Sequence, residues 1–248
     1  MRKVYLIPNF VTTANMFAGF CSVVYSIRGD FETAAWAILV AAVFDMLDGR
    51  IARMAKATSQ FGVEYDSLSD LISFGMAPAI LLYQWVLQPF GRLGWAASFL
   101  YMACGALRLA RFNVTTETLP KGYFQGLPIP MAAGVIATFE IFSRHLGWVE
   151  APPIIAISMA FGLASIMVST LRFPSFKEFN WRSKASFGYL AVGILSMILI
   201  AAEPETALFV VISTYVSLGL LWNAYRWISG AARRERLAAE QVGHLGGK

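Results

Sequence analysis

The chain has 248 residues, of which 57% are hydrophobic and 14% charged, with a formal net charge of +5 and a pI near 9.3. Because soluble domains carry nearer a quarter charged residues, this composition excludes an ordinary soluble protein and indicates an integral membrane protein. The basic balance alone would also suit a nucleic-acid partner. The basic residues lie at the ends of apolar segments, however, so we expect contact with anionic lipids and no nucleic acid.

Apolar segments follow one another along the chain, each close to the ~20 residues that span a bilayer core. The first has no cleavage site of the signal-peptide kind and is expected to remain as a helix. The fold class predicted is an all-α integral membrane protein with about eight transmembrane helices. Residues 1–230 would form the transmembrane catalytic domain and 231–248 a charged cytoplasmic tail. The eight expected spans are 10–27, 33–52, 69–88, 94–111, 128–146, 152–170, 186–202 and 205–227.

The basic residues also predict an orientation. If alternate segment ends are assigned to one side of the membrane, that side receives all but three of the 20 lysines and arginines, the exceptions being Arg28, Arg92 and Arg144. Cytoplasmic loops carry such an excess. We therefore expect a protein of the cell (inner) membrane with both termini, and the aspartate-rich stretch described next, on the cytoplasmic side.

Four of the five aspartates in the chain are Asp45, Asp48, Asp66 and Asp70, in the pattern D-x2-D-G-x2-A-R-x8-G-x3-D-x3-D. Residues three or four apart share one face of a helix, so each pair of carboxylates points the same way. If the two helix ends face each other, four acids meet where the dielectric constant is low, and hard divalent cations would hold them together. The alternative is that they are helix caps and loop acids at a membrane surface. The glycines and arginine between them favour the metal site.

Those intervening residues are suited to binding phosphate. Arg53 supplies a guanidinium fork, and Gly49 and Gly62 allow the backbone to approach a ligand closely. Acidic residues at a membrane edge are costly to maintain and are usually functional.

The pattern resembles the signature of the CDP-alcohol phosphotransferase family, with every fixed position matched. The matched positions are Asp45, Asp48, Gly49, Ala52, Arg53, Gly62, Asp66 and Asp70. The resemblance implies a six-helix core over about the first three quarters of the chain. It also implies transfer of a phosphoalcohol group from a CDP-alcohol to an acceptor alcohol, with release of CMP, assisted by two divalent cations (Mg2+ or Mn2+).

Roles for individual residues follow from the same resemblance. It implies metal ligation by all four aspartates, with Asp70 also acting as the general base. The residues implied to contact the CDP moiety are Asn9, Thr12, Asn15, Asp48, Gly49, Arg53, Ser59 and Gly62.

Two further stretches bear on the acceptor. The run L-R-L-A-R-F-N at 107–113 and the run F-Q-G-L-P-I-P at 124–130 are similar to those of family members that use CDP-diacylglycerol and L-serine. Arg108 or Arg111 could then bind the serine carboxylate through two parallel hydrogen bonds, with Asn113 beside them. The alternative is that both arginines anchor a helix among phosphate headgroups. Membrane lipids are the other expected partners, and a homodimer is left open.

Two rival functions remain at this stage. A sister enzyme using glycerol 3-phosphate or an inositol compound would need more basic residues near the metal site, because its acceptor is more anionic. A divalent-cation transporter would place the acids at the membrane midplane on broken helices. The acids here lie at one edge, which counts against transport. Glu140, in another apolar run, is expected near the outer end with a structural role.

Overall fold

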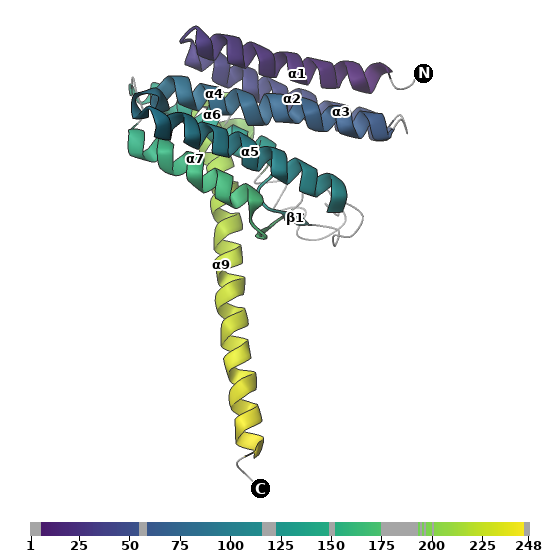
Figure 1. Ribbon diagram of the computed structural model, residues 1–248, viewed down its shortest axis with the longest axis vertical. Helices are drawn as coiled ribbons and strands as arrows, with labels where there is room; N and C mark the ends of the chain where they lie inside the picture. The colour runs from purple at the N-terminus through teal and green to yellow at the C-terminus, as the bar shows by residue number, and fades with distance from the viewer. Residues whose placement is uncertain are drawn as a thin grey trace.

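The structure is a computed structural model that describes residues 6–54, 59–115, 123–148, 152–174, 193, 195, 197–199 and 201–245. Helices form almost all of it and run side by side in a bundle, from which one long helix projects (Figure 1). The predicted all-α membrane class is confirmed.

Helices α1 (Leu6–Ile27) and α2 (Phe31–Met54) form an antiparallel hairpin. Gly29 makes the turn with a φ of 79°, a conformation that costs glycine little. Asp30 then caps α2, since its Oδ1 accepts a hydrogen bond from the Thr33 amide at 3.2 Å. Small residues on α2, such as Ala34, Ala35 and Ala41, are fully buried, which allows the neighbouring helices to approach closely.

The third expected span belongs to one continuous helical rod, Gln60–Phe90, which begins earlier than the sequence predicted. The expected span started at residue 69, but α3 covers Gln60–Asp70 and is followed without interruption by a π-helical turn, η2 (Leu71–Met76), and α4 (Ala77–Leu82). A second π turn, η3 (Tyr83–Leu87), and a 3-10 turn, η4 (Gln88–Phe90), complete the rod. The early start has a local cause, because the Ser59 hydroxyl accepts a hydrogen bond from the Gly62 amide at 3.0 Å.

The rest of the bundle consists of α5 (Arg92–Thr115), α6 (Ile129–His145) and α7 (Pro153–Val168). Two short antiparallel strands, β1 (Tyr123–Gln125) and β2 (Arg172–Pro174), pair next to the ends of α5 and α7. The sequence analysis did not foresee these strands, since three residues are too few to show an alternating pattern.

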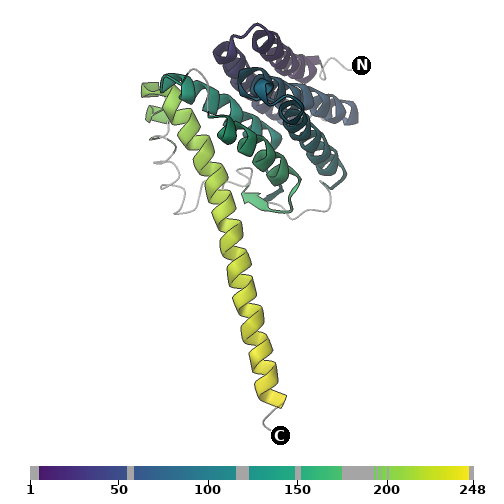
Figure 2. The same cartoon turned by 60° about the vertical axis from the view of Figure 1, so that its left-hand side comes forward.

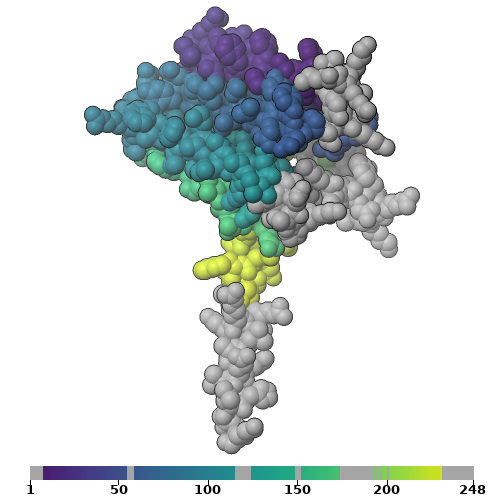
Figure 3. All heavy atoms as spheres, turned by 45° about the vertical axis from the view of Figure 1, so that its right-hand side comes forward, coloured from purple at the N-terminus to yellow at the C-terminus, as the bar shows by residue number. Residues whose placement is uncertain are grey.

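The long helix α9 (Pro204–Leu245) joins the predicted eighth span and the predicted tail in one continuous element. It begins against α6, crosses the bundle and projects away from it (Figures 1 and 2). Its last described side chains, before residue 231, stand clear of the bundle in the space-filling view (Figure 3). Most of the predicted seventh span, 186–202, lies outside the described residues, and the described ones within it are helical.

Length and composition identify four helical stretches able to cross a membrane within the described residues: Pro8–Ile27, Gln60–Phe90, Arg92–Val114 and Pro204–Gly230. The helix Pro153–Val168 is apolar but shorter. Large apolar side chains, including Phe17, Leu221 and Trp222, are exposed on the outside of the bundle. Such a surface suits lipid, and the protein is therefore a membrane protein whose number of spans stays a prediction.

Candidate active site

Three of the four aspartates meet where the second half of α2 faces α3. Carboxylate oxygens of Asp45, Asp48 and Asp66, one from each residue, lie within 4.8 Å of one another. Asp45 and Asp48 come from α2 and Asp66 from α3, and both helices pack against α1, which brings the three carboxylates together. The predicted meeting of two acidic helix ends is found for these three residues.

The burial and hydrogen bonding of these oxygens fit a cation. Asp48 is only 4% exposed, and its Oδ2 is buried without a hydrogen-bond partner among the described residues. The same holds for Oδ1 of Asp66. A buried carboxylate oxygen without a donor is costly, and a divalent cation supplies the missing partner. The acidic group could therefore hold a divalent metal ion.

Asp70 lies one turn further along α3 and is 8% exposed. The Asn15 side-chain amide donates a hydrogen bond to its Oδ1 at 3.3 Å. Asp70 is not part of the close group of three, although the charges of Asp45, Asp48 and Asp66 all act on it. Its carboxylate thus borders the acidic group and is oriented from α1.

A cavity of about 170 Å3 opens beside the acidic group between α1, α2 and the start of α3. Seven of the eight residues expected to contact CDP line it, and the eighth, Asn15, is fully buried behind Asp70. Its lining is Pro8, Asn9, Thr12, Asp48, Gly49, Ala52, Arg53, Ser59, Gly62, Val63 and Asp66. The lining places the Arg53 guanidinium, two glycines and the backbone of the first turn of α3 next to the carboxylates of Asp48 and Asp66. This arrangement suits a ligand that carries phosphate.

Two serines that the sequence analysis did not single out, one at the end of α3 and one in η2, hold these two elements against α1. The Ser69 hydroxyl donates to the Thr12 carbonyl at 3.0 Å, and the Ser73 hydroxyl donates to the Asn15 carbonyl at 3.0 Å. A Cβ on Gly19 would lie 2.5 Å from the Ser73 hydroxyl oxygen, so only glycine allows this close packing. The signal was present: Ser69 and Ser73 are four apart in an apolar run, where hydroxyls usually bond to a neighbouring helix.

Arg108 on α5 is 6% exposed, and its Nε is buried without a hydrogen-bond partner among the described residues. Its guanidinium lies over the Phe112 ring, 5.6 Å from the centroid, and feels the charges of Asp70 and Asp45. A buried guanidinium with an unused donor next to the acidic group is suited to an anionic ligand.

Arg111, three residues further along α5, is engaged differently. It donates to the carbonyls of Val168 at 2.6 Å, Met167 at 3.0 Å, Ser169 at 3.1 Å and Gln125 at 3.2 Å. Three of these carbonyls end α7, where helix carbonyls lack intrahelical partners, and the fourth belongs to β1. Arg111 thus joins α5, α7 and β1.

Gly126 explains part of the run at 124–130. Its φ is 74°, and a Cβ there would lie 2.2 Å from the Met167 carbonyl oxygen. Its amide donates to the Leu171 carbonyl at 2.8 Å. The backbone therefore passes Arg111's partners at a distance that only glycine permits.

Asn113, the third residue expected near serine, forms a link between helices. Its Nδ2 donates to the Ser67 hydroxyl oxygen at 3.0 Å, which connects α5 to the acidic helix α3. The link sets the position of Arg108's helix relative to Asp66 and Asp70.

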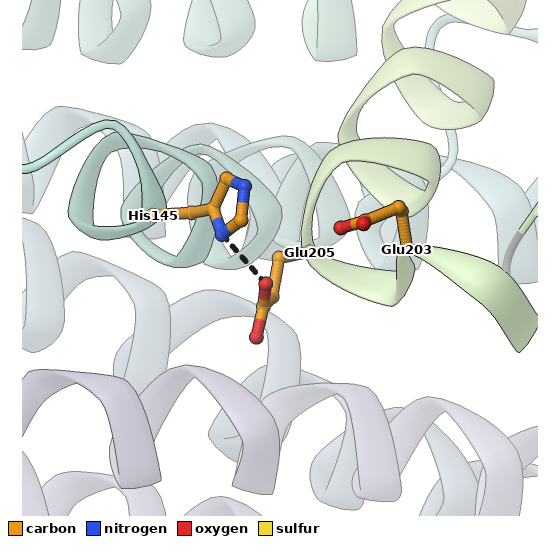
Figure 4. Close-up of side chains that lie close together, drawn as sticks. All are labelled: His145, Glu203 and Glu205. Carbon is orange, nitrogen blue, oxygen red and sulfur yellow. Dashed lines mark ion pairs between the residues drawn. The ribbon is translucent and has the colours of Figure 1, made fainter.

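A second group of possible metal ligands lies at the far end of the bundle. His145 at the end of α6 faces Glu203 and Glu205 at the start of α9 (Figure 4). His145 Nδ1 and Glu205 Oε2 are 2.7 Å apart, and all three side chains have substantial contact with solvent. Nearby, Arg144 pairs with Glu140 at 3.1 Å and with Glu32 at 3.8 Å. Glu140 thus has a charged partner at this end, and the structural role expected for it stays a prediction.

Comparisons with known proteins agree with this geometry. The sequence model of the CDP-alcohol phosphatidyltransferase family matches residues 5–229. A CDP-diacylglycerol–serine O-phosphatidyltransferase of Helicobacter pylori (strain ATCC 700392 / 26695) is 36% identical over 92% of this chain and 93% of its own length. The protein of the same name in Bacillus subtilis is 34% identical over 69% of this chain and 92% of its own length. An archaetidylserine synthase of Methanothermobacter thermautotrophicus is 37% identical over 68% of this chain and 69% of its own length.

The fold and the site define an all-α membrane protein with a buried carboxylate group that is suited to divalent cations, beside a cavity suited to phosphate. The chain belongs to the CDP-alcohol phosphatidyltransferase family.

Proposed function

We propose that the protein transfers the phosphatidyl group of CDP-diacylglycerol to the hydroxyl of L-serine, giving phosphatidylserine and CMP. The observation that carries the proposal is the juxtaposition of the acidic group, its buried oxygens without partners, and the cavity that contains Arg53. The names of the relatives, two of them CDP-diacylglycerol–serine O-phosphatidyltransferases, support the choice of donor and acceptor.

Each aspartate has a proposed role. Asp45, Asp48, Asp66 and Asp70 would hold two divalent cations, Mg2+ or Mn2+. Such ions, when bound, neutralise the diphosphate and the charge that develops on the leaving CMP. Asp70 would accept the proton of the acceptor hydroxyl, because Asn15 orients it at the edge of the acidic group.

The donor would occupy the cavity between α1, α2 and α3. Arg53 would bind a phosphate oxygen, while Gly49 and Gly62 leave room for the nucleotide beside Asn9, Thr12 and Ser59. Asp48 both lines this cavity and belongs to the acidic group, so the phosphate would lie next to the cations.

The acceptor would enter from the side of α5. Of the two arginines expected near serine, Arg108 has a buried donor without a partner in the part of the chain that the structure describes, whereas Arg111 donates to four carbonyls. We therefore assign the serine carboxylate to Arg108 and a structural function to Arg111. Asn113 would hold α5 in place through Ser67.

The deciding experiment supplies purified protein with CDP-diacylglycerol and Mg2+ or Mn2+, and follows CMP and lipid product. Serine, glycerol 3-phosphate and inositol are compared as acceptors. We expect CMP release that depends on serine and on the divalent cation, with phosphatidylserine as product. Faster turnover with another acceptor would reassign the protein within its family. Metal uptake into vesicles without CMP release would favour a transporter.

We also propose that both termini and the active site face the cytoplasm, with residues 1–230 as the catalytic domain and 231–248 as a charged tail. The distribution of basic residues supports this orientation. Single cysteines at Ser59 and Gly91, introduced in a variant without Cys21 and Cys104, should show opposite accessibility to an impermeant thiol reagent in intact cells. Equal labelling would reject the orientation.

A further inference from the structure

A row of aromatic residues, called the wall below, leads from the buried guanidinium of Arg108 across the paired strands to α9. The Phe112 ring beneath that guanidinium lies 6.4 Å from the Phe124 ring on β1. Phe124 is paired with Phe173 across the two strands, and the Phe173 ring lies 6.2 Å from that of Tyr215 on α9. The wall therefore runs from α5 through both strands to the long C-terminal helix.

Three residues at four-residue intervals place α9 on this wall. Tyr215, Gly219 and Asn223 share one face of the helix. A Cβ on Gly219 would lie 2.4 Å from Phe173 Cε1, so the ring packs directly on the helix backbone. Asn223 accepts from the Arg172 amide at 3.0 Å and donates to the Arg172 carbonyl at 2.8 Å. Strand β2 is thus fixed to the face of α9 that carries Tyr215.

The aromatic contacts bring Tyr215 to the same side of the bundle as Arg108. Tyr215 is half-buried, and its phenol and the Arg108 guanidinium interact electrostatically. A phenol oxygen next to a buried guanidinium can accept one of its hydrogen bonds. The remaining N–H groups would then stay available to an anionic ligand near Asp70, whose charge also acts on Arg108.

We propose that Tyr215 is a positioning residue of the acceptor site, which holds the Arg108 guanidinium in the orientation that receives the carboxylate of the acceptor. This inference rests on the proposed function. It makes α9 a working part of the site, although the aspartate motif, the cavity and Arg108 all come from α1, α2, α3 and α5.

The test uses the full-length protein in detergent or liposomes and the variant Tyr215→Phe, which keeps the ring against Phe173 and removes the hydroxyl. We expect the KM for serine to rise roughly 5- to 12-fold, which is within the range that the loss of one hydrogen bond produces. The KM for CDP-diacylglycerol and kcat should change less than about twofold. Tyr225→Phe, on the same helix and 66% exposed, is the matched control and should behave as the wild type.

A double-mutant cycle separates positioning from a structural role. Because Tyr215 is proposed to act through Arg108, Tyr215→Phe should change kcat/KM for serine less than about twofold in an Arg108→Gln background. Full additivity of the two changes would overturn the proposal. So would an equal rise in both substrates' KM, or no change in Tyr215→Phe.

A second variant protects the test against misfolding. Asn223→Ala leaves Tyr215 intact but releases Arg172, and should raise the KM for serine in the same selective way. An unchanged KM for serine in folded Asn223→Ala, judged by its elution volume and melting temperature, would contradict the inference. If the wild type shows no serine-dependent CMP release, the proposed function fails instead, so the two failures are distinguishable.

Discussion

Within the described residues, two groups of possible metal ligands lie near opposite ends of α2 and differ in how their oxygens are satisfied: the exposed group of His145, Glu203 and Glu205, and the buried group of Asp45, Asp48 and Asp66. Glu32 at the start of α2 is paired with Arg144, the neighbour of His145, whereas Asp48 is 16 residues further on, about 24 Å along the axis. His145, Glu203 and Glu205 are in contact with solvent, and His145 is paired with Glu205 at 2.7 Å. Asp48 is buried and Asp66 half-buried, and each has a carboxylate oxygen that no described residue supplies with a donor.

The comparison shows that proximity of possible ligands does not define a site. Each group has three side chains whose ligand atoms lie within 4.8 Å of one another. In the exposed group, water and an ion pair satisfy the charges at little cost. In the buried group, neither solvent nor an ion pair within the described residues compensates the desolvation free energy of the Asp48 and Asp66 oxygens that lack a donor. A bound divalent cation would compensate it.

The largest effect is expected from neutralising the buried group. Asp48→Asn or Asp66→Asn removes one anionic ligand without changing the volume of the side chain. Breaking a buried ionic contact costs about 3–5 kcal/mol, or roughly 10²- to 10³-fold in turnover at 1.4 kcal/mol per decade. Initial rates of serine-dependent CMP release measure this, and His145→Gln with Glu205→Gln is the matched control from the other group. A comparable loss of turnover in the variants of both groups would contradict the distinction between the buried and the exposed group.

Asp70→Asn tests the role of the aspartate that borders the buried group. The variant keeps an oxygen that can accept the Asn15 hydrogen bond but loses the base, so we expect kcat to fall about 10²-fold, with smaller changes in either KM. The measurement is a full kinetic analysis at saturating divalent cation. A fall that extra Mg2+ or Mn2+ reverses would show that Asp70 acts as a ligand and not as the base.

The two arginines of α5 provide the next comparison. Arg108→Ala should raise the KM for serine roughly 10- to 150-fold, since a charge-assisted hydrogen bond contributes about 1.5–3 kcal/mol. Arg111→Ala should instead lower the melting temperature, because four carbonyls at α7 and β1 lose their donor. The opposite pattern would exchange the roles assigned to the two residues.

The smallest effect is expected at the exposed group. His145→Ala removes a solvent-exposed ion pair that contributes about 0–1 kcal/mol, and should shift the melting temperature by no more than ~4 °C. Turnover should be unaffected. A large loss of activity in this variant would show that the far end of the bundle is coupled to the chemistry.

Much of the site could be predicted because its information is local. Asp45 and Asp48, or Asp66 and Asp70, share a helix face whatever the rest of the fold does, and the membrane class follows from composition alone. The predicted start of the third span at residue 69 was wrong, since α3 begins at Gln60: Gly62 in its first turn favours a loop until the Ser59 cap is seen.

The remaining features depend on contacts between distant segments. Arg108 and Arg111 are indistinguishable in sequence, being three residues apart at the same helix end, and the carbonyls of α7 decide between them. Tyr215 lies more than a hundred residues from Arg108, and no local pattern connects them. Ser67, as partner of Asn113, is known only once α3 and α5 are side by side.

The π-helical turn η2 follows Asp70 directly, and its Phe74 carbonyl accepts a hydrogen bond from the Tyr101 hydroxyl at 3.0 Å. Such a turn accommodates one residue more than an α-helical turn of the same rise. Removing one residue there would restore the α-helical period and rotate everything before it by about 100° relative to everything after. Asp66 and Asp70 would then turn away from Asp45 and Asp48 while α4 stayed packed. The π-helical turn therefore sets the rotation of α3 relative to α4, so that the carboxylates on α3 and the buried side chains on α4 can each face their own partners.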